Sequence, residues 1–344
     1  MSEAINPQQG GAVQSQFRAL LVRQDEQGYR TELAGLPLSF LGAEGVLVRV
    51  AYSSLNYKDA LAITGSGKII RDFPLIPGID LAGTVIEGRG SPFRPGEPVL
   101  LTGWGVGERF HGGLADYARL RPEWLLRLPE GMGLRQSMAL GTAGLTAMLC
   151  VLALEQHGVR PASGRVVVTG ATGGVGSLAV AILARLGWQV VAVTGKPEQG
   201  DWLRQLGASE IVARDTLAAP ARPLESESYA AAIDTAGGAV LAGLLPRMAW
   251  GACVAACGLA AGASLQTTVM PFILRGVTLA GVDSVQCPLA TREVAWQRLA
   301  ECLPADALAG LVREIGLEDV VTMCRQMQQG QSHGRVVVRL AGEG

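Results

Sequence analysis

Histidine and cysteine are scarce in this chain, and their positions argue against a zinc site. The 344 residues include three histidines and six cysteines, and no cysteine precedes Cys150. Cys253 and Cys257 stand four residues apart in an apolar, strand-like segment with no histidine nearby in the sequence. Because zinc is usually held by closely spaced cysteine and histidine side chains, no metal site is expected. Cysteines within apolar patterns are typical of reduced thiols in a cytoplasmic protein.

An excess of charge and a long apolar run are also missing. Lys and Arg number 29 against 30 Asp and Glu, so no basic surface for a nucleic-acid partner is indicated. Glycine or charged residues interrupt the apolar runs before the roughly 18 residues that a membrane helix needs. Residues 1–16 are polar and lack the apolar core of a secretory signal, so we expect a disordered tail there. Neither a nucleic-acid nor a membrane partner is predicted.

Residues 163–196 carry the clearest structural signal in the chain. A β-branched run at residues 165–169 predicts a buried strand, a turn of small residues follows at 170–176, and residues 177–186 have the composition of a helix. A second β-branched run predicts another strand at residues 190–194. A strand-turn-helix-strand unit of about 30 residues has the size of a right-handed βαβ crossover.

The turn of this unit is rich in glycine. Gly173 and Gly176 have the spacing of the last two glycines in a dinucleotide fingerprint, but Gly170 lies three residues before Gly173, where the standard pattern has two. Without Cβ atoms, the backbone at the start of a helix can approach a pyrophosphate, which the helix N-terminus favours. The strand before and the helix after favour a nucleotide site over a purely structural turn.

The end of the second strand lacks the acidic residue that binds the ribose of NAD. Thr194, Gly195 and Lys196 stand there instead. A hydroxyl and a lysine would hold a 2′-phosphate that a carboxylate would repel, so NADPH is favoured over NADH. Lys196 could also be a solvated loop residue. Arg214, which follows a strand predicted at residues 210–213, is either a second cation at this phosphate or a surface residue.

The length of the chain allows two domains. Short strands predicted at residues 17–22, 45–52, 82–87 and 98–102, between Gly- and Pro-rich turns, indicate a small β-barrel-type domain over residues 17–140. A helix predicted at residues 141–156 leads into alternating strands and helices, which predict a doubly wound parallel sheet over residues 141–309. A last strand at residues 335–340 is expected to return to the first domain, which residues 310–344 would complete. The predicted fold class is therefore α/β.

Five blocks of sequence resemble one family. They read S-S-L-N-Y-K-D-A-L-A-I-T-G (53–65), F-P-L-I-P-G-I-D-L-A-G-T-V (73–85), L-L-T-G-W-G-V-G-E (100–108), V-V-V-T-G-A-T-G-G-V-G-S (166–177) and T-T-V-M-P-F-I-L-R (267–275). With the domain order, they make the chain similar to the medium-chain dehydrogenase/reductase superfamily, in its zinc-free, quinone-oxidoreductase-like branch. More narrowly, the chain resembles the YhdH/AcuI group, the NADPH-dependent acrylyl-CoA reductases.

This resemblance implies a fold, an activity and an assembly. The fold is a Rossmann-type parallel sheet with a GroES-like domain. The activity is reduction of the 2,3 double bond of acryloyl-CoA to propanoyl-CoA with NADPH and without zinc. The implied assembly is a homodimer that joins edge strands near residues 278–282. The resemblance also implies cofactor contacts at Thr172, Gly173, Gly174 and Val175 (pyrophosphate), Thr194, Gly195, Lys196 and Arg214 (2′-phosphate), Leu259 and Ser284 (nicotinamide), and Arg335 from the return strand.

Reduction of a conjugated thioester places negative charge on its oxygen, and donors in the cleft must stabilise that charge when no metal does. Asn56 could donate through its amide, or it could cap the following helix. Tyr57 could lie against the nicotinamide and offer its hydroxyl, or it could be a core tyrosine. Asp80 is either buried and paired with Asn56 or Lys58, or a turn residue. These three are the candidate catalytic residues, and the proton for the α-carbon could come from Tyr57 or water.

Several alternatives stay open at this point. Lys68 and Arg71 could meet the phosphates of CoA, although a solvated loop is the simpler interpretation. His111 could line the cleft or be an ordinary loop histidine. The main alternative activity is an NADPH:quinone or general enone reductase of the same superfamily. A more remote alternative is a non-catalytic NADPH-binding protein.

Overall fold

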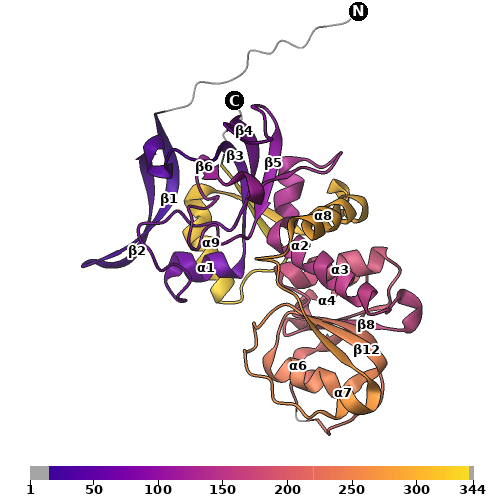
Figure 1. Cartoon of the computed structure of the whole chain (residues 1–344). Helices are drawn as coiled ribbons and strands as arrows, with labels where there is room; N and C mark the ends of the chain where they lie inside the picture. The colour runs from indigo at the N-terminus through magenta and orange to yellow at the C-terminus, as the bar shows by residue number, and fades with distance from the viewer. Residues whose placement is uncertain (1–14, 220, 341–344) are drawn as a thin grey trace, which may run out of the picture.

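The computed structural model describes residues 15–219 and 221–340 and has two lobes, each built on its own β-sheet (Figure 1). The lower lobe in Figure 1 is the predicted nucleotide domain. Its strands are β8 (Val166–Thr169), β9 (Val190–Thr194), β10 (Ala208–Ala213), β11 (Tyr229–Asp234), β12 (Met248–Ala256) and β13 (Thr278–Gly281). They lie in the order β10-β9-β8-β11-β12-β13, and all neighbours are parallel. This is the strand order of a Rossmann sheet, so the predicted fold of this domain is confirmed.

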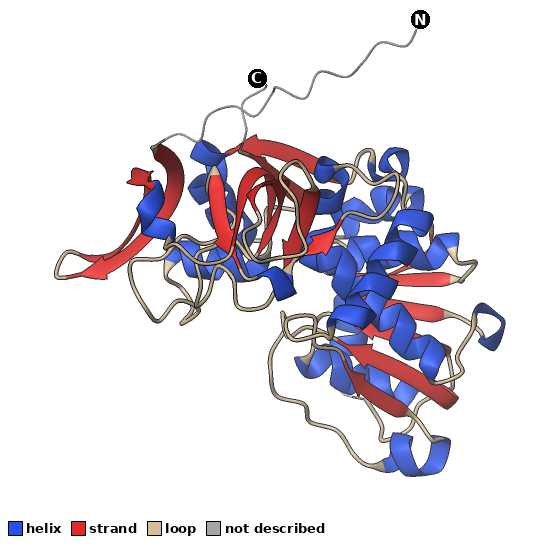
Figure 2. Cartoon of the chain, turned by 45° about the horizontal axis from the view of Figure 1, so that its top comes forward, coloured by secondary structure: helices blue, strands red, loops and turns tan. Residues whose placement is uncertain are grey.

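Helices cover both faces of this sheet, as Figure 2 shows in blue against the red strands. They include α3 (Gly174–Arg185), α4 (Gly200–Gln205), α5 (Arg214–Ala218), α6 (Gly238–Leu244) and α7 (Met270–Arg275), and also α2 (Leu134–Gln156), which contacts β11 and β12. Helix α8 (Leu289–Cys302) packs against α2. The short helices α5 and α7 were not predicted.

The other lobe is built on mostly antiparallel strands. They are β3 (Val46–Leu55), β4 (Asp80–Glu87), β5 (Pro98–Thr102), β6 (Tyr117–Leu120), β7 (Leu126–Arg127), β14 (Val312–Gly316) and β15 (Arg335–Arg339), in the order β14-β15-β3-β4-β5-β7 with β6 paired to β3. The return of β15 to β3 is confirmed. A second returning strand, β14, was missed because its sequence V-R-E-I-G buries one side chain and lacks a clear alternation.

Two further features complete this lobe. A hairpin of β1 (Gln16–Asp25) and β2 (Gly28–Pro37) lies at its outer edge, and Gln16 therefore belongs to a strand rather than to the expected tail, whose residues 1–14 lie outside the described residues. Helix α1 (Tyr57–Thr64) packs against α9 (Val320–Gln328), so the early and late parts of the chain lie side by side in Figure 1.

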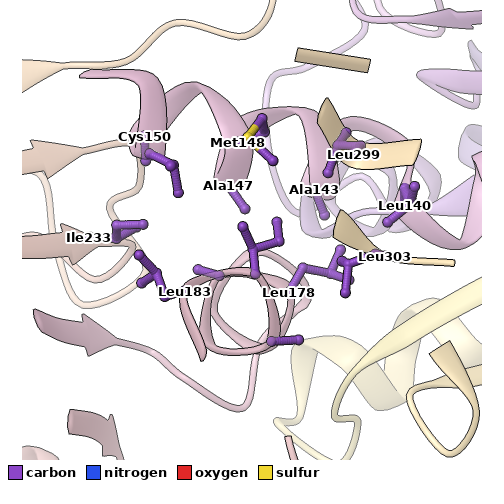
Figure 3. Packing of buried hydrophobic residues seen from close by; sticks show 14 of the residues in the cluster. Leu140, Ala143, Ala147, Met148, Cys150, Leu178, Leu183, Ile233, Leu299 and Leu303 are labelled. Carbon is purple, nitrogen blue, oxygen red and sulfur yellow. The ribbon is translucent and has the colours of Figure 1, made fainter. Parts of the chain in front are cut away.

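Helix α2 (Leu134–Gln156) connects the two lobes through a shared core. It is long and apolar enough to cross a membrane by length and composition, with a mean hydropathy of 1.9, but 83% of its apolar window is buried inside the protein. The small side chains of Ala143 and Ala147 let α2 approach α3 closely (Figure 3). The core around them contains Leu140, Met148 and Cys150 of α2, Leu178 and Leu183 of α3, Ile233 of β11, and Leu299 and Leu303 of α8.

Candidate active site

A cleft of about 520 Å³ lies where the two lobes meet. One wall is the glycine-rich turn after β8, and the other is the start of α1. The segments 282–285 and 332–336 also line it. The nucleotide-domain residues of this wall follow the carboxyl ends of parallel strands, which is where ligands bind in open α/β sheets.

The glycine-rich turn has the shape that a pyrophosphate requires. Gly170 has a φ of 60°, and a Cβ there would lie 2.3 Å from Oγ1 of Thr235. A Cβ at Gly176 would lie 2.2 Å from the carbonyl oxygen of Gly170, so only glycine lets the helix pack this closely on the turn. The predicted contacts Thr172, Gly173, Gly174 and Val175 all line the cleft, at the N-terminus of α3. These residues therefore fit a dinucleotide phosphate.

Two cations lie near Gly195 at the end of β9. Lys196 lines the cleft, and its Nζ donates to the carbonyl oxygen of Ser332 at 2.6 Å. Partial burial lowers the pKa of Lys196, and the nearby Glu198 opposes this effect. The Arg214 guanidinium lies against Gly195, since a Cβ on that glycine would be 3.1 Å from its Cζ. Arg214 also forms an exposed ion pair of 3.5 Å with Asp215.

Thr194 stabilises the end of β9 through its buried hydroxyl. Its side chain is buried, and its Oγ1 accepts a hydrogen bond from the backbone N–H of Lys196 at 3.0 Å. The hydroxyls of Thr172 and Thr194 are 3.3 Å apart, which connects the glycine-rich turn to the end of β9. All four residues that the resemblance implies for the 2′-phosphate thus lie at or beside the end of β9, and Lys196 is the one among them that lines the cleft.

Asp80 is the centre of a buried polar network behind the cleft wall. It is 0% exposed, and its carboxylate accepts hydrogen bonds from Oγ of Ser54 (2.6 Å) and Nδ2 of Asn56 (2.8 Å). The backbone N–H and the hydroxyl of Thr142 also donate to it, at 2.9 and 2.5 Å. Of the alternatives for Asp80, burial with pairing to Asn56 is confirmed, whereas Lys58 pairs with Glu108 at 3.0 Å.

Asn56 caps α1, and its side-chain amide hydrogen-bonds within this network. Its Nδ2 donates to Asp80 and, at 3.3 Å, to Asp59, while its Oδ1 accepts from Nη1 of Arg335 at 3.2 Å. The capping alternative is therefore present, in the form of a capping box with Asp59. Because its amide hydrogens already have acceptors, this geometry suits a positioning role better than direct donation to a substrate oxygen.

Asp59 was not singled out from the sequence. It is 1% exposed, and it accepts from the backbone N–H groups of Asn56 (2.8 Å) and Ile79 (2.9 Å). Burial, together with the charge of Asp80, raises the pKa of Asp59 to about 7. The N-x-x-D spacing from Asn56 to Asp59 is a capping-box signal that could have found it.

Arg335 connects this network to the glycine-rich turn. It is 2% exposed and donates to the carbonyl oxygens of Ala139 (3.0 Å) and Leu55 (3.3 Å) and to Oγ of Ser54 (2.9 Å). Burial lowers the pKa of Arg335, and the charges of Asp80 and Asp59 oppose this shift. A Cβ on Gly174 would lie 3.1 Å from its Nη1, so the guanidinium lies directly beside the turn.

Because Gly141 has no side chain, Asp80 and Ser54 can pack directly against α2. The φ of 53° at Gly141 kinks the helix, and a Cβ there would lie 2.5 Å from Oδ2 of Asp80 and 2.6 Å from Oγ of Ser54. The following residue, Thr142, then turns both its N–H and its hydroxyl toward Asp80. Sequence reasoning missed Thr142, because nothing in an apolar helical pattern shows that a distant carboxylate lies beneath it.

The remaining predicted site residues differ in their placement. Tyr57 is 54% exposed and lines the cleft, so the alternative of a core tyrosine is wrong. Ser284 lines the cleft as well, and its Oγ accepts from the hydroxyl of Thr146 at 2.9 Å. Leu259 is 67% exposed and is not among the residues that line the cleft.

Of the three open cases, the structure tests only His111. Lys68 and Arg71 are exposed, which suits a solvated loop and a contact with CoA phosphates equally. His111 packs its ring against Phe40 at 4.8 Å, and its Nδ1 accepts from the backbone N–H of Ile76 at 3.3 Å. Burial lowers the pKa of His111. Within residues 15–219 and 221–340, no group of three or more His, Cys, Asp or Glu side chains is placed to hold a metal ion.

Comparisons with known proteins cover almost the whole chain. Residues 42–130 match the family model "Alcohol dehydrogenase GroES-like domain", and residues 174–301 match "Zinc-binding dehydrogenase". The acrylyl-CoA reductase AcuI of Ruegeria pomeroyi is 51% identical over 325 residues, which cover 94% of this chain and 98% of that protein.

Two solved structures are similar in both sequence and fold. The yhdH oxidoreductase from Salmonella enterica in complex with NADP has a TM-score of 0.92 and 53% identity. Escherichia coli K-12 YhdH with bound NADPH has a TM-score of 0.91 and 52% identity. Each similarity covers 94% of this chain and 100% of the solved chain.

Proposed function

Because this chain belongs to the medium-chain dehydrogenase/reductase superfamily, in the group of the acrylyl-CoA reductase AcuI, we propose that it reduces the 2,3 double bond of acryloyl-CoA to propanoyl-CoA with NADPH. The predicted family and the GroES-like and Rossmann fold class are confirmed. The single observation that carries the proposal is the cleft itself. Its glycine-rich turn, with Lys196 and Arg214 nearby at the end of β9, lies opposite the polar residues Asn56 and Tyr57 at the start of α1.

The cofactor fits one wall of this cleft. The turn from Thr172 to Val175 and the N-terminus of α3 would hold the pyrophosphate, and Lys196 and Arg214 would hold the 2′-phosphate. Ser284 lines the same cleft, and we assign it to the nicotinamide as the family resemblance implies. Bound there, NADPH would supply a hydride for the β-carbon of the thioester. Although one matching family model is named for zinc binding, we propose no zinc-dependent step, because no cysteine precedes Cys150 to serve as a ligand in the first domain.

The protein's own task is to stabilise the negative charge that develops on the thioester oxygen. Tyr57 lines the cleft at the start of α1 and is 54% exposed, so we assign its hydroxyl to the substrate oxygen or to proton return at the α-carbon. A well-placed donor of this kind contributes about 3 kcal/mol to the transition state. Asn56 and Asp80 act as positioning residues, because they fix the first turn of α1 and the backbone of Tyr57.

Steady-state rates with NADPH test the activity. Acryloyl-CoA should be reduced faster than crotonyl-CoA or a quinone, with propanoyl-CoA as the product. Absence of any rate with acryloyl-CoA contradicts the proposal. Turnover of quinones or simple enones alone favours the enone-reductase alternative, and NADPH binding without turnover favours the non-catalytic one.

We also propose that the protein is a homodimer joined through β13. This strand is at the end of the parallel sheet, and large apolar side chains are exposed near it: Trp250 is 79% exposed, Val269 65%, Ile273 71% and Leu274 56%. An unpaired edge beside apolar side chains is a suitable surface for a second copy. Light scattering should give twice the 35.9 kDa of one chain, and Ile273→Glu should give the monomer mass. A monomeric wild type contradicts the proposal.

A cytoplasmic location is the remaining part of this proposal. It is supported by the six cysteines, all of which are unpaired. Fractionation of cells that produce the protein tests it, and recovery outside the cytoplasmic fraction contradicts it.

A further inference from the structure

Arg292 is a buried cation that is not part of the cleft wall. It lies in the first turn of α8 and is 0% exposed. Its Nε donates to the carbonyl oxygen of Cys287 (2.9 Å), and its Nη1 donates to the carbonyl oxygen (2.7 Å) and hydroxyl (3.1 Å) of Thr102. Its Nη2 donates to the carbonyl oxygens of Ser284 and Val285, both at 2.7 Å.

All five acceptors are uncharged. A guanidinium has five N–H donors, and each of these bonds is matched to one acceptor in fixed geometry. Burial lowers the pKa of Arg292, and the charges of Cys287, Asp283 and Asp80 oppose this effect. Removing this charge from water costs free energy, and the five hydrogen bonds offset part of that cost. Because the acceptors come from two separate segments, the same bonds fix how those segments lie against one another.

That arrangement joins the two lobes. Thr102 ends β5 in the first lobe, whereas Ser284, Val285 and Cys287 lie in the segment between β13 and α8 of the nucleotide domain. The backbone N–H of Trp104 also donates to the carbonyl oxygen of Val285 at 3.1 Å. One side chain thus holds the segment of residues 282–287 against the end of β5.

Arg292 and residues 284–285 also pack closely against Gly103 and Trp104 of the first lobe. The Arg292 guanidinium lies 4.6 Å from the ring centroid of Trp104, which has a φ of 56°. A left-handed backbone is unfavourable for a tryptophan, and such conformations persist where the surroundings impose them. A Cβ on Gly103 would lie 3.2 Å from the carbonyl oxygens of Ser284 and Val285, so the two segments are in close contact. Within residues 15–219 and 221–340, Nε1 of Trp104 is buried without a partner.

The segment that Arg292 holds forms part of the cleft. Ser284 and Val285 line it, together with Gly103 on the opposite lobe. The Ser284 hydroxyl is itself fixed by Thr146 of α2. The residues that would hold the phosphates, 172–175 and Lys196, belong to other segments, so among the expected coenzyme contacts Arg292 hydrogen-bonds only to the segment in which Ser284 would meet the nicotinamide.

We propose that Arg292 is a positioning residue for hydride transfer: by holding residues 284 and 285 against the end of β5, it sets the distance between the nicotinamide and the substrate. This inference rests on the proposed NADPH site, and it does not depend on which enone is the acceptor. Misplacement of reacting atoms by about 1 Å can lower a rate by roughly 100-fold. Loss of Arg292 should therefore reduce kcat strongly and leave the binding of NADPH nearly unchanged.

Arg292→Met and Arg292→Lys test this inference in the full-length enzyme. In R292M we expect kcat to fall at least about tenfold, the primary isotope effect with deuterated NADPH to rise, and the Kd of NADPH to change less than about threefold. R292K keeps a cation and some donors, so it should recover part of kcat. It also provides the measurement if R292M does not fold.

Arg298→Met is the matched control. Arg298 lies on the same helix and pairs with Glu155, with a side chain that is 25% exposed. It should lower the melting temperature without a change in kcat or in the isotope effect. The inference is wrong if the Arg292 variants, assayed well below their melting temperatures, match R298M in kcat or lose only NADPH affinity. If the wild type reduces another enone but not acryloyl-CoA, the proposed substrate fails, and the same comparison with that enone still tests Arg292.

Discussion

Removal of the Asp80 carboxylate should destabilise the protein and inactivate it together. In Asp80→Ala, four buried donors lose their acceptor: Oγ of Ser54, Nδ2 of Asn56, and the backbone N–H and hydroxyl of Thr142. Arg335 also loses a carboxylate that lies 4.0 Å from its Nη2. Each buried donor without a partner costs about 1–3 kcal/mol, so the loss of stability should be at least about 4 kcal/mol. Asp80→Asn keeps the shape and one acceptor, and should cost about 2 kcal/mol.

Urea unfolding and steady-state kinetics measure both effects. Because Asn56 and Thr142 line the cleft, kcat/KM should fall at least about tenfold in Asp80→Ala. Glu32→Ala is the control: it removes a carboxylate that pairs at 2.7 Å with Arg23, with side chains 44% and 36% exposed, and an exposed pair contributes less than about 1 kcal/mol. If the two alanine variants lose equal stability and Asp80→Ala keeps its activity, the network around Asp80 does not have the role described above.

Three further predictions concern Asp59, the glycine-rich turn and Tyr57. Burial in the folded state raises the pKa of Asp59 from 3.8 to about 7, so the folded state binds this proton more tightly than the unfolded state does. The free energy of unfolding should therefore fall by up to about 4 kcal/mol between about pH 4 and pH 7. In urea titrations at several pH values, Asp59→Asn should remove this pH dependence, and an unchanged dependence would assign it to another group. Gly176→Ala places a Cβ 2.2 Å from a backbone oxygen and should weaken the binding of NADPH at least tenfold in a fluorescence titration. The control is Gly133→Ala, whose Cβ would have no atom within 4 Å, and this variant should bind NADPH as the wild type does. Equal affinities of the two variants would contradict the phosphate site. Tyr57→Phe should lower kcat about 100-fold at unchanged melting temperature, because an exposed hydroxyl contributes little to the fold, and a wild-type kcat removes Tyr57 from the mechanism.

Local patterns in the sequence predicted the parts of the protein that depend on neighbouring residues. The β-branched runs, the glycine-rich turn and the missing acid after Thr194 are all local; the runs form the buried strands β8 and β9, and the turn and Lys196 line the cleft. The return of β15 could be predicted because a strand that follows helices needs a partner. For β14, the charged residues hide the pairing that the sheet supplies.

The polar network could be predicted only in part, because its contacts join distant segments. Asp80 stood out as an acid in an apolar run, but its partner Thr142 is 62 positions away and looks like any polar residue in a helix. Arg292 gave no signal, since an arginine in a helix is usually solvated, and its acceptors are mostly backbone carbonyl oxygens that every residue carries. Such residues are identified only after the tertiary fold brings their partners together.

The most direct test of the account is a paired titration of the protein with NADPH and NADH. The end of β9 offers Lys196 and Arg214 to a 2′-phosphate, and hydrogen bonds to charged groups contribute about 1.5–3 kcal/mol each. NADPH should therefore bind at least about tenfold more tightly than NADH, and Lys196→Ala should remove most of that preference with little effect on NADH. Equal or tighter binding of NADH by the wild type contradicts the assignment of this cleft to a phosphorylated coenzyme.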